Sequence, residues 1–225
     1  MALRGHAAQA GQHPFMSLTL KPGLYRVLKV LLLLFFRSYL RLHVTGQEWI
    51  PHGACVVIAN HRSNMDPPLI GVAMPRPIYY MAKEELFRFA LFGRFLTWIG
   101  VFPVRRGRYD RRAINQALCV LRAGYALSVF PEGTRQRHGR GTLGPERDGA
   151  ALLAVWSGVP VLPAAIVGNY GWRQPVEVRF GPPIRLEGPV RSKDLAEKSR
   201  RLMLEIQGLL DAGPPGRRSG CATGS

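Results

Sequence analysis

His61 and Asp66 are the first residues whose types and spacing could do chemistry. They lie five positions apart in NHRSNMD (60–66), directly after the apolar run ACVVIA (54–59). On a straight helix this spacing separates two side chains by about 140°, so the pair can meet only across a turn. There a carboxylate would hold the imidazole in one tautomer and strengthen it as a base, which makes His61 a candidate general base for a hydroxyl.

The same two residues also have a purely structural interpretation. Asp66 is followed by Pro67, and this order is typical of a helix N-cap with proline at the first helical position. His61 would then bond only a loop carbonyl. Spacing alone does not separate a catalytic pair from a capped helix start.

Two more polar segments follow apolar runs that are typical of strands. VRRG (104–107) contains Arg105 and Arg106, and a solvated basic surface is the usual fate of such a run. FPEGTR (130–135) offers a carboxylate, a permissive backbone, a hydroxyl and a guanidinium, from Glu132, Gly133, Thr134 and Arg135. These groups suit a phosphate cradle, although a turn after a strand needs only the glycine.

Apolar and amphipathic stretches alternate around these segments. Strands are expected at 54–60, 77–83, 101–104, 125–130, 159–167 and 176–180. Helices are expected at 84–100, at 110–124 with Asp110 as cap, around 149–158, and at about 192–211. Strands alternating with helices predict an α/β fold with a mixed, mostly parallel central sheet flanked by helices. Ligands of such sheets collect where strands give way to loops.

The segment 24–44 is apolar but carries Arg26, Lys29, Arg37 and Arg41. Its longest uncharged run, 30–36, is far shorter than the roughly 20 residues that span a bilayer. Basic residues around an apolar middle favour a helix that lies in an anionic membrane interface. A helix packed in the core is the alternative. The aromatic face of 84–100 leaves a similar choice between core packing and an acyl-tail groove.

The 31 basic and 14 acidic residues give a net charge of +17. This balance indicates anionic partners, which include nucleic acid, phosphate-bearing metabolites and acidic membrane surfaces. No nucleic-acid-binding motif is found. The 3 cysteines are scattered and lack C-x-x-C spacing, so neither a disulfide framework nor a metal site is expected.

Taken together, NHRSNMD, GVFPVRRG, FPEGTR and VPVLPAAIVG resemble, in order and spacing, the four sequence blocks of the glycerolipid acyltransferases. The resemblance is to the lysophosphatidic acid (1-acyl-sn-glycerol-3-phosphate) acyltransferases in particular, and runs from about Thr45 to Gly181. It implies that His61 deprotonates the sn-2 hydroxyl of a lysophospholipid while Asp66 supports His61. That hydroxyl then attacks the thioester of acyl-CoA or acyl carrier protein, without an acyl-enzyme, a cofactor or a metal.

The resemblance also implies a set of substrate-binding residues. Arg106 matches the arginine of the second block, and the acceptor phosphate would be held by Glu132, Gly133, Thr134 and Arg135. Two substrate-binding positions depart from the common pattern. Arg105 stands where an acidic residue is frequent, which affects the acceptor headgroup. Arg147 stands where a lysine is frequent, so a guanidinium fork replaces a point charge.

We therefore expect four regions: a disordered extension (1–20), a membrane-associating helix (21–44), an acyltransferase domain (45–212) and a disordered tail (213–225). The resemblance implies a peripheral or monotopic enzyme of a bacterial cytoplasmic membrane, facing the cytoplasm and producing phosphatidic acid. The alternatives are the same chemistry on another acceptor such as a lyso-ornithine lipid, a basic nucleic-acid-binding protein, and a membrane-associated scaffold.

Overall fold

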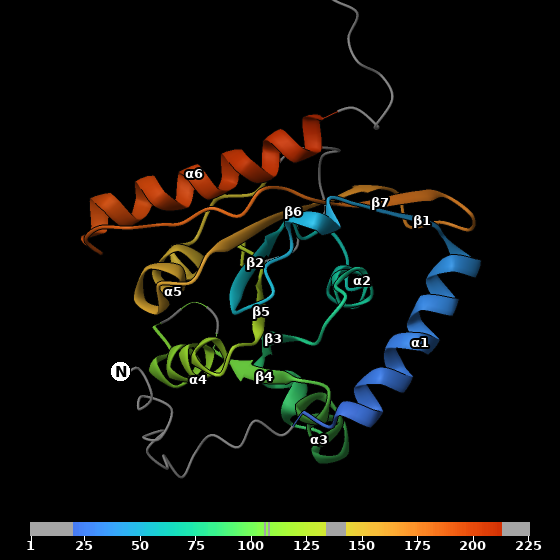
Figure 1. Ribbon diagram of the computed structural model, residues 1–225. Coiled ribbons are helices and arrows are strands. Elements are labelled where there is room, and N and C mark those ends of the chain that lie inside the picture. The colour runs from blue at the N-terminus through green and yellow to red at the C-terminus, as the bar shows by residue number, and fades with distance from the viewer. Residues whose placement is uncertain (1–19, 106, 108, 134–142, 213–225) are drawn as a thin grey trace, which may run out of the picture.

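The computed structural model describes residues 20–105, 107, 109–133 and 143–212 (Figure 1). The predicted extension, except Leu20, and the predicted tail lie outside these residues. Three predicted substrate-binding residues, Arg106, Thr134 and Arg135, also lie outside them.

One seven-stranded sheet forms the centre of the described chain, in the order β1-β7-β6-β2-β5-β3-β4. Its strands are β1 (Arg41–Thr45), β2 (Cys55–Ala59), β3 (Ile78–Lys83), β4 (Val101–Val104), β5 (Ala126–Val129), β6 (Val161–Gly168) and β7 (Pro175–Phe180). The pair of β6 and β7 is antiparallel and the other paired neighbours are parallel. The predicted mixed, mostly parallel sheet is therefore confirmed.

Helices cover both faces of the sheet. They are α1 (Pro22–Tyr39), α2 (Asp66–Ala73), α3 (Ala90–Trp98), α4 (Arg111–Arg122), α5 (Gly149–Ser157) and α6 (Ser192–Asp211), with 3-10 turns η1 (Gln47–Trp49) and η2 (Glu84–Phe87). Figure 1 shows α4, α5 and α6 on one face and α1 and α2 on the other. Within the described residues, no helix is long and apolar enough to cross a bilayer.

Strand β2 lies in the middle of the sheet and divides two cores. Its five residues are fully buried. Val56 and Ile58 face the core under α4, α5 and α6, whereas Val57 faces the core under α1 and α2. Because β6, β2, β5, β3 and β4 run in the same direction, the loops that follow them meet at one edge of the sheet.

Two predicted helices differ from the structure. The helix expected to reach residue 44 ends at Tyr39, because Leu40 is extended (φ −116°, ψ 159°) and the next residues form β1 against β7. The helix expected over 84–100 is divided into η2 and α3, since Phe89 adopts an extended conformation (φ −83°, ψ 106°) between them. In contrast, α6 begins and ends at the residues predicted for it, 192 and 211.

The turn after β1 gives a test of this topology. Gly46 has φ +74°, and a Cβ there would lie 2.0 Å from the carbonyl oxygen of Phe180 in β7. We expect Gly46→Ala to lower the free energy of unfolding by at least about 2 kcal/mol, because left-handed backbone strain adds to a backbone clash. Urea unfolding followed by circular dichroism measures this change.

Gly208→Ala in α6 is the matched control. Nothing lies within 4 Å of its added Cβ, so this helical substitution is expected to raise the free energy of unfolding by roughly 0.5–1 kcal/mol. Equal effects of the two substitutions would contradict the close approach of the turn to β7.

Candidate active site

His61 and Asp66 meet in the loop between β2 and α2. Nδ1 of His61 lies 2.9 Å from Oδ2 of Asp66, and their exposed fractions are 6% and 0%. The N-cap interpretation of Asp66 is wrong in detail, because α2 begins at Asp66 and Met65 holds the cap position. The Asp66 carboxylate instead accepts backward from the backbone N–H groups of Arg62 (2.5 Å) and Ser63 (2.7 Å).

Tyr170, just beyond the C-terminal end of β6, completes the surroundings of Asp66. The Tyr170 hydroxyl donates to Oδ1, the oxygen that does not face His61. Asp66 therefore accepts from three donors on Oδ2 and one on Oδ1. Because this buried carboxylate acts as an acceptor, the geometry assigns the imidazole proton to Nδ1 and leaves Nε2 free to accept a proton.

Several contacts hold the histidine loop in place. The Phe130 ring stacks on the His61 ring with centroids 4.2 Å apart and planes inclined by 23°. The Asn60 side chain exchanges two hydrogen bonds with the backbone of Ile166, at 3.1 and 2.7 Å. Nη1 of Arg62 donates to the carbonyl of Gly168 at 3.0 Å. The loop after β2 is thus tied to the ends of β5 and β6.

Glu132, which we predicted to bind substrate, contacts the histidine loop. It is 2% exposed, and its two oxygens accept from the backbone N–H of His61 (2.9 Å) and of Gly144 (3.2 Å). Burial raises the pKa of this carboxyl, although the two N–H donors oppose that shift. Both contacts are to backbone, so Glu132 fixes His61 in position.

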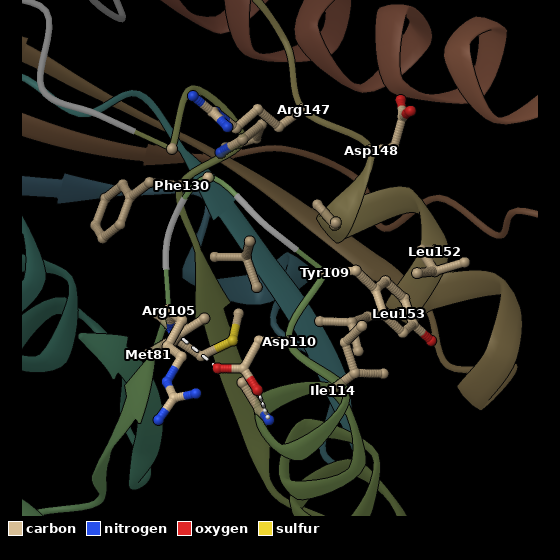
Figure 2. Close-up of a pocket in the computed structure, with 18 of the residues that line it drawn as sticks. Met81, Arg105, Tyr109, Asp110, Ile114, Phe130, Arg147, Asp148, Leu152 and Leu153 are labelled. Carbon is tan, nitrogen blue, oxygen red and sulfur yellow. Dashed lines mark hydrogen bonds between the residues drawn. The ribbon is translucent and has the colours of Figure 1, made fainter. Parts of the chain in front are cut away.

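A pocket of about 780 Å³ opens beside His61 (Figure 2). Most of its walls are apolar and come from strands of the sheet and from α4 and α5, including Met81, Ile114, Val129, Leu152 and Leu153. Figure 2 shows Ile114 and Leu153 on neighbouring helices, with Phe130 and Arg147 at the other end. The pocket thus joins an apolar interior to a polar rim at the candidate base.

Two predicted substrate-binding arginines lie on this pocket in different states. Arg105 makes a bidentate ion pair with Glu84, with nitrogen–oxygen distances of 2.7 and 3.1 Å. The hydrogen bonds from Arg105 lower the pKa of the Glu84 carboxyl. Arg147 lies across Gly133, where φ is +66° and an added Cβ would come within 2.4 Å of Cδ of the arginine. The Arg147 guanidinium has no carboxylate partner among the residues the structure describes.

The cap of α4 connects these groups to the fold. Oδ1 of Asp110 accepts from the backbone N–H groups of Arg112 (3.1 Å) and Ala113 (3.2 Å), which confirms the predicted cap. Oδ2 of Asp110 accepts from the backbone N–H of Arg105 at 2.8 Å. One carboxylate therefore fixes both the start of α4 and the backbone of Arg105.

Sequence reasoning missed Phe130 and Tyr170 as parts of the site. Phe130 is the first residue of FPEGTR, so its membership of this block could have predicted a place in the site. Tyr170 is 104 positions from Asp66 and belongs to no recognised spacing. Among the described residues, no group of three or more His, Cys, Asp or Glu side chains could hold a metal ion.

Comparison with known proteins places this geometry in a family. The Acyltransferase family model matches residues 41–167. The chain is similar to 1-acyl-sn-glycerol-3-phosphate acyltransferases of Streptococcus pneumoniae (30% identity over 68% of this chain and 60% of the relative) and Bacillus subtilis (35% over 56% and 62%). It thus spans about three fifths of the length of these two relatives.

A solved structure has the same fold. The 1-acyl-sn-glycerophosphate (LPA) acyltransferase PlsC of Thermotoga maritima aligns with a TM-score of 0.64 and 26% identity, over 82% of this chain and 78% of that one. The region that matches the family model is more than half of the chain, and it includes His61, Asp66 and Glu132. On these grounds the chain belongs to the acyltransferase family.

Proposed function

We propose that this protein transfers a fatty acyl group from an acyl thioester to the sn-2 hydroxyl of 1-acyl-glycerol-3-phosphate, which gives phosphatidic acid. The observation that carries the proposal is the 2.9 Å contact between His61 and Asp66 beside an apolar pocket. The names of the relatives support this choice of acceptor. The acyl donor is acyl-CoA or acyl carrier protein.

In the proposed reaction, Nε2 of His61 takes the proton of the acceptor hydroxyl as its oxygen attacks the thioester carbonyl carbon. The C–S bond then breaks, and the imidazolium returns the proton to the departing thiolate. Asp66 stabilises the imidazolium and keeps Nε2 directed toward the pocket rim. The enzyme is thereby regenerated without an external proton donor.

Transfer of the acyl group directly to the acceptor hydroxyl agrees with the protonated state of the buried Cys55 thiol. Cys55 is fully buried in β2, and burial raises the pKa of its thiol to about 11 against the opposing effect of Arg76. The thiolate is the reactive form of cysteine. Cys55 is therefore a poor nucleophile, which favours attack by the acceptor hydroxyl itself over a covalent acyl-enzyme.

Arg147 is a candidate for holding the acceptor phosphate. Its guanidinium lies at the pocket and has no described carboxylate partner, and a planar fork suits bidentate phosphate binding. Arg105 is a second candidate for binding the phosphate. It is the weaker of the two, because the ion pair with Glu84 already neutralises its charge. Arg106, Thr134 and Arg135 keep their predicted roles in this acceptor site.

We assign the apolar pocket to an acyl chain. Its volume of about 780 Å³ falls in the range of pockets that bury most of the surface of a drug-sized ligand. Its walls from α4 and α5 include the aliphatic side chains of Ala113, Ile114, Leu152 and Leu153, which suit the methylenes of an acyl chain. Each methylene buried there contributes about 0.8 kcal/mol, so the pocket favours a long-chain substrate.

The exposed face of α1 fits a membrane surface. It carries large apolar side chains that are 42–59% exposed at helical spacing, namely Val27, Val30, Leu31, Leu34 and Phe35. In α3, Leu91 is 85% exposed, and the start of α1 contacts the end of α3 through the Lys21 N–H and the Trp98 carbonyl (2.8 Å). We propose that both helices rest on the cytoplasmic membrane of a bacterium.

Replacing the base tests the reaction directly. His61→Ala is expected to lower kcat by roughly 10³-fold, since a positioned general base contributes about 10²–10⁴-fold. The measurement uses labelled acyl-CoA with 1-acyl-glycerol-3-phosphate and, in parallel, lyso-ornithine lipid and other lysophospholipids. His52→Ala changes an exposed histidine outside the site and is expected to keep normal activity.

Two outcomes would contradict these assignments. Near-normal transfer by His61→Ala would reject the base. Higher kcat/KM for another acceptor in the wild-type protein would reject the assignment of the acceptor while keeping the chemistry.

Narrowing the pocket tests the acyl site. Ile114→Trp is expected to lower kcat/KM for a palmitoyl thioester about tenfold relative to an octanoyl thioester, because excluding two methylenes costs about 1.6 kcal/mol. Leu204→Trp, at a 65% exposed position of α6 outside the pocket, is the control and should leave this ratio unchanged. An unchanged ratio for Ile114→Trp would place the chain elsewhere.

Charge on α1 tests membrane contact. The double variant Leu31→Glu, Leu34→Glu is expected to reduce partitioning onto phosphatidylglycerol vesicles by at least about 100-fold, since each leucine contributes roughly 1.5–3 kcal/mol when buried. Co-sedimentation measures the bound fraction. The control is Leu204→Glu, which alters an exposed leucine of α6. Equal losses in both variants would show that α1 is not the contact.

A further inference from the structure

Tyr170 lies just beyond β6 and contacts the side of Asp66 that faces away from the histidine. Its hydroxyl donates to Oδ1, while Oδ2 receives Nδ1 of His61 at 2.9 Å. The two contacts thus hold the carboxylate from opposite ends. Tyr170 is absent from the residues that line the pocket, so it has no described contact with the space assigned to substrate.

The phenol stays protonated in this environment. Burial, followed by the negative charge of Asp66, raises the pKa of Tyr170, whereas Arg62 opposes the shift. A protonated hydroxyl is required, because an ionised phenolate could not donate to the carboxylate. Tyr170 is therefore a permanent donor at ordinary pH.

The other charged and titratable groups around Asp66 come from two loops, those after β2 and β5. Arg62 precedes α2 and gives its guanidinium to Gly168, and Glu132 follows β5 and accepts the His61 N–H. His61 itself follows β2. Tyr170 is the contribution of β6, so each of the three central parallel strands supplies a group to the same cluster.

We propose that Tyr170 is a positioning residue for the acyl transfer reaction, which orients Asp66 and withdraws part of its charge from His61. This inference rests on the proposed function. The hydroxyl prevents the carboxylate from rotating, so Oδ2 stays aligned with Nδ1. It also shares the negative charge of the carboxylate with the His61 ring.

The expected effects of Tyr170→Phe follow from these two actions. Without the donor, Oδ1 is buried and unpaired, the carboxylate loses its alignment, and kcat falls about tenfold. More of the carboxylate charge then acts on His61 and favours its protonated form. The base works only when unprotonated, so the acidic limb of the pH dependence of kcat/KM moves to higher pH. KM for the donor stays unchanged, since Tyr170 does not line the pocket.

The experiment compares Tyr170→Phe with Tyr125→Phe in the full chain. Tyr125 is a partly buried tyrosine at the opposite end of β5, where its ring packs on Tyr79 at 5.1 Å between centroids. Both variants lose one phenolic oxygen. Only Tyr170→Phe is expected to lower kcat and move the acidic limb, and thermal melting should show both variants folded.

Equal kinetics for the two variants, or a lower kcat with an unmoved acidic limb, would overturn the inference. A wild-type protein that acylates no acceptor would instead overturn the proposed function. Amide exchange then tests Tyr170 without substrate. The N–H groups of Arg62 and Ser63, which Asp66 accepts, should exchange about tenfold faster in Tyr170→Phe than in Tyr125→Phe. Equal exchange rates would reject the positioning role.

Discussion

The buried carboxylate of Asp66 is the constraint on which the rest of the site depends. A charge with no exposed surface is costly unless every lone pair finds a donor. Asp66 finds four donors, from the His61 ring, the Arg62 and Ser63 backbones and the Tyr170 hydroxyl. Satisfying this one group bends the loop after β2 back on itself and places α2 immediately behind it. The histidine is oriented as a consequence.

The parallel core of the sheet explains why distant residues can satisfy that carboxylate. Strands β2, β5 and β6 are neighbours that run in the same direction, so their following loops meet at one edge. His61 comes from the first loop, Glu132 from the second and Tyr170 from the third. Glu132 bonds the His61 backbone while Phe130 stacks on its ring. The active-site geometry is thus a product of strand order, and each loop restrains the others.

Local signals made part of this arrangement predictable from sequence. The Asp110 cap and the bounds of α6 were correct, because a capping side chain and a long apolar stripe act within a few residues. Strand β1 was missed because its partner β7 lies far along the chain, and an apolar segment alone does not distinguish strand from helix.

The sequence did not decide whether His61 contacts Asp66, for the same reason. The geometry of this contact depends on Tyr170 and Glu132, which lie far from both residues in the sequence and match no recognised spacing. The most direct test of this geometry is the tautomer of His61, read from nitrogen-15 NMR of the ring in the wild-type protein at mildly alkaline pH. We predict a neutral ring with the proton on Nδ1 and an unprotonated Nε2. A proton on Nε2, or equal population of both tautomers, would contradict the orientation of the base by Asp66.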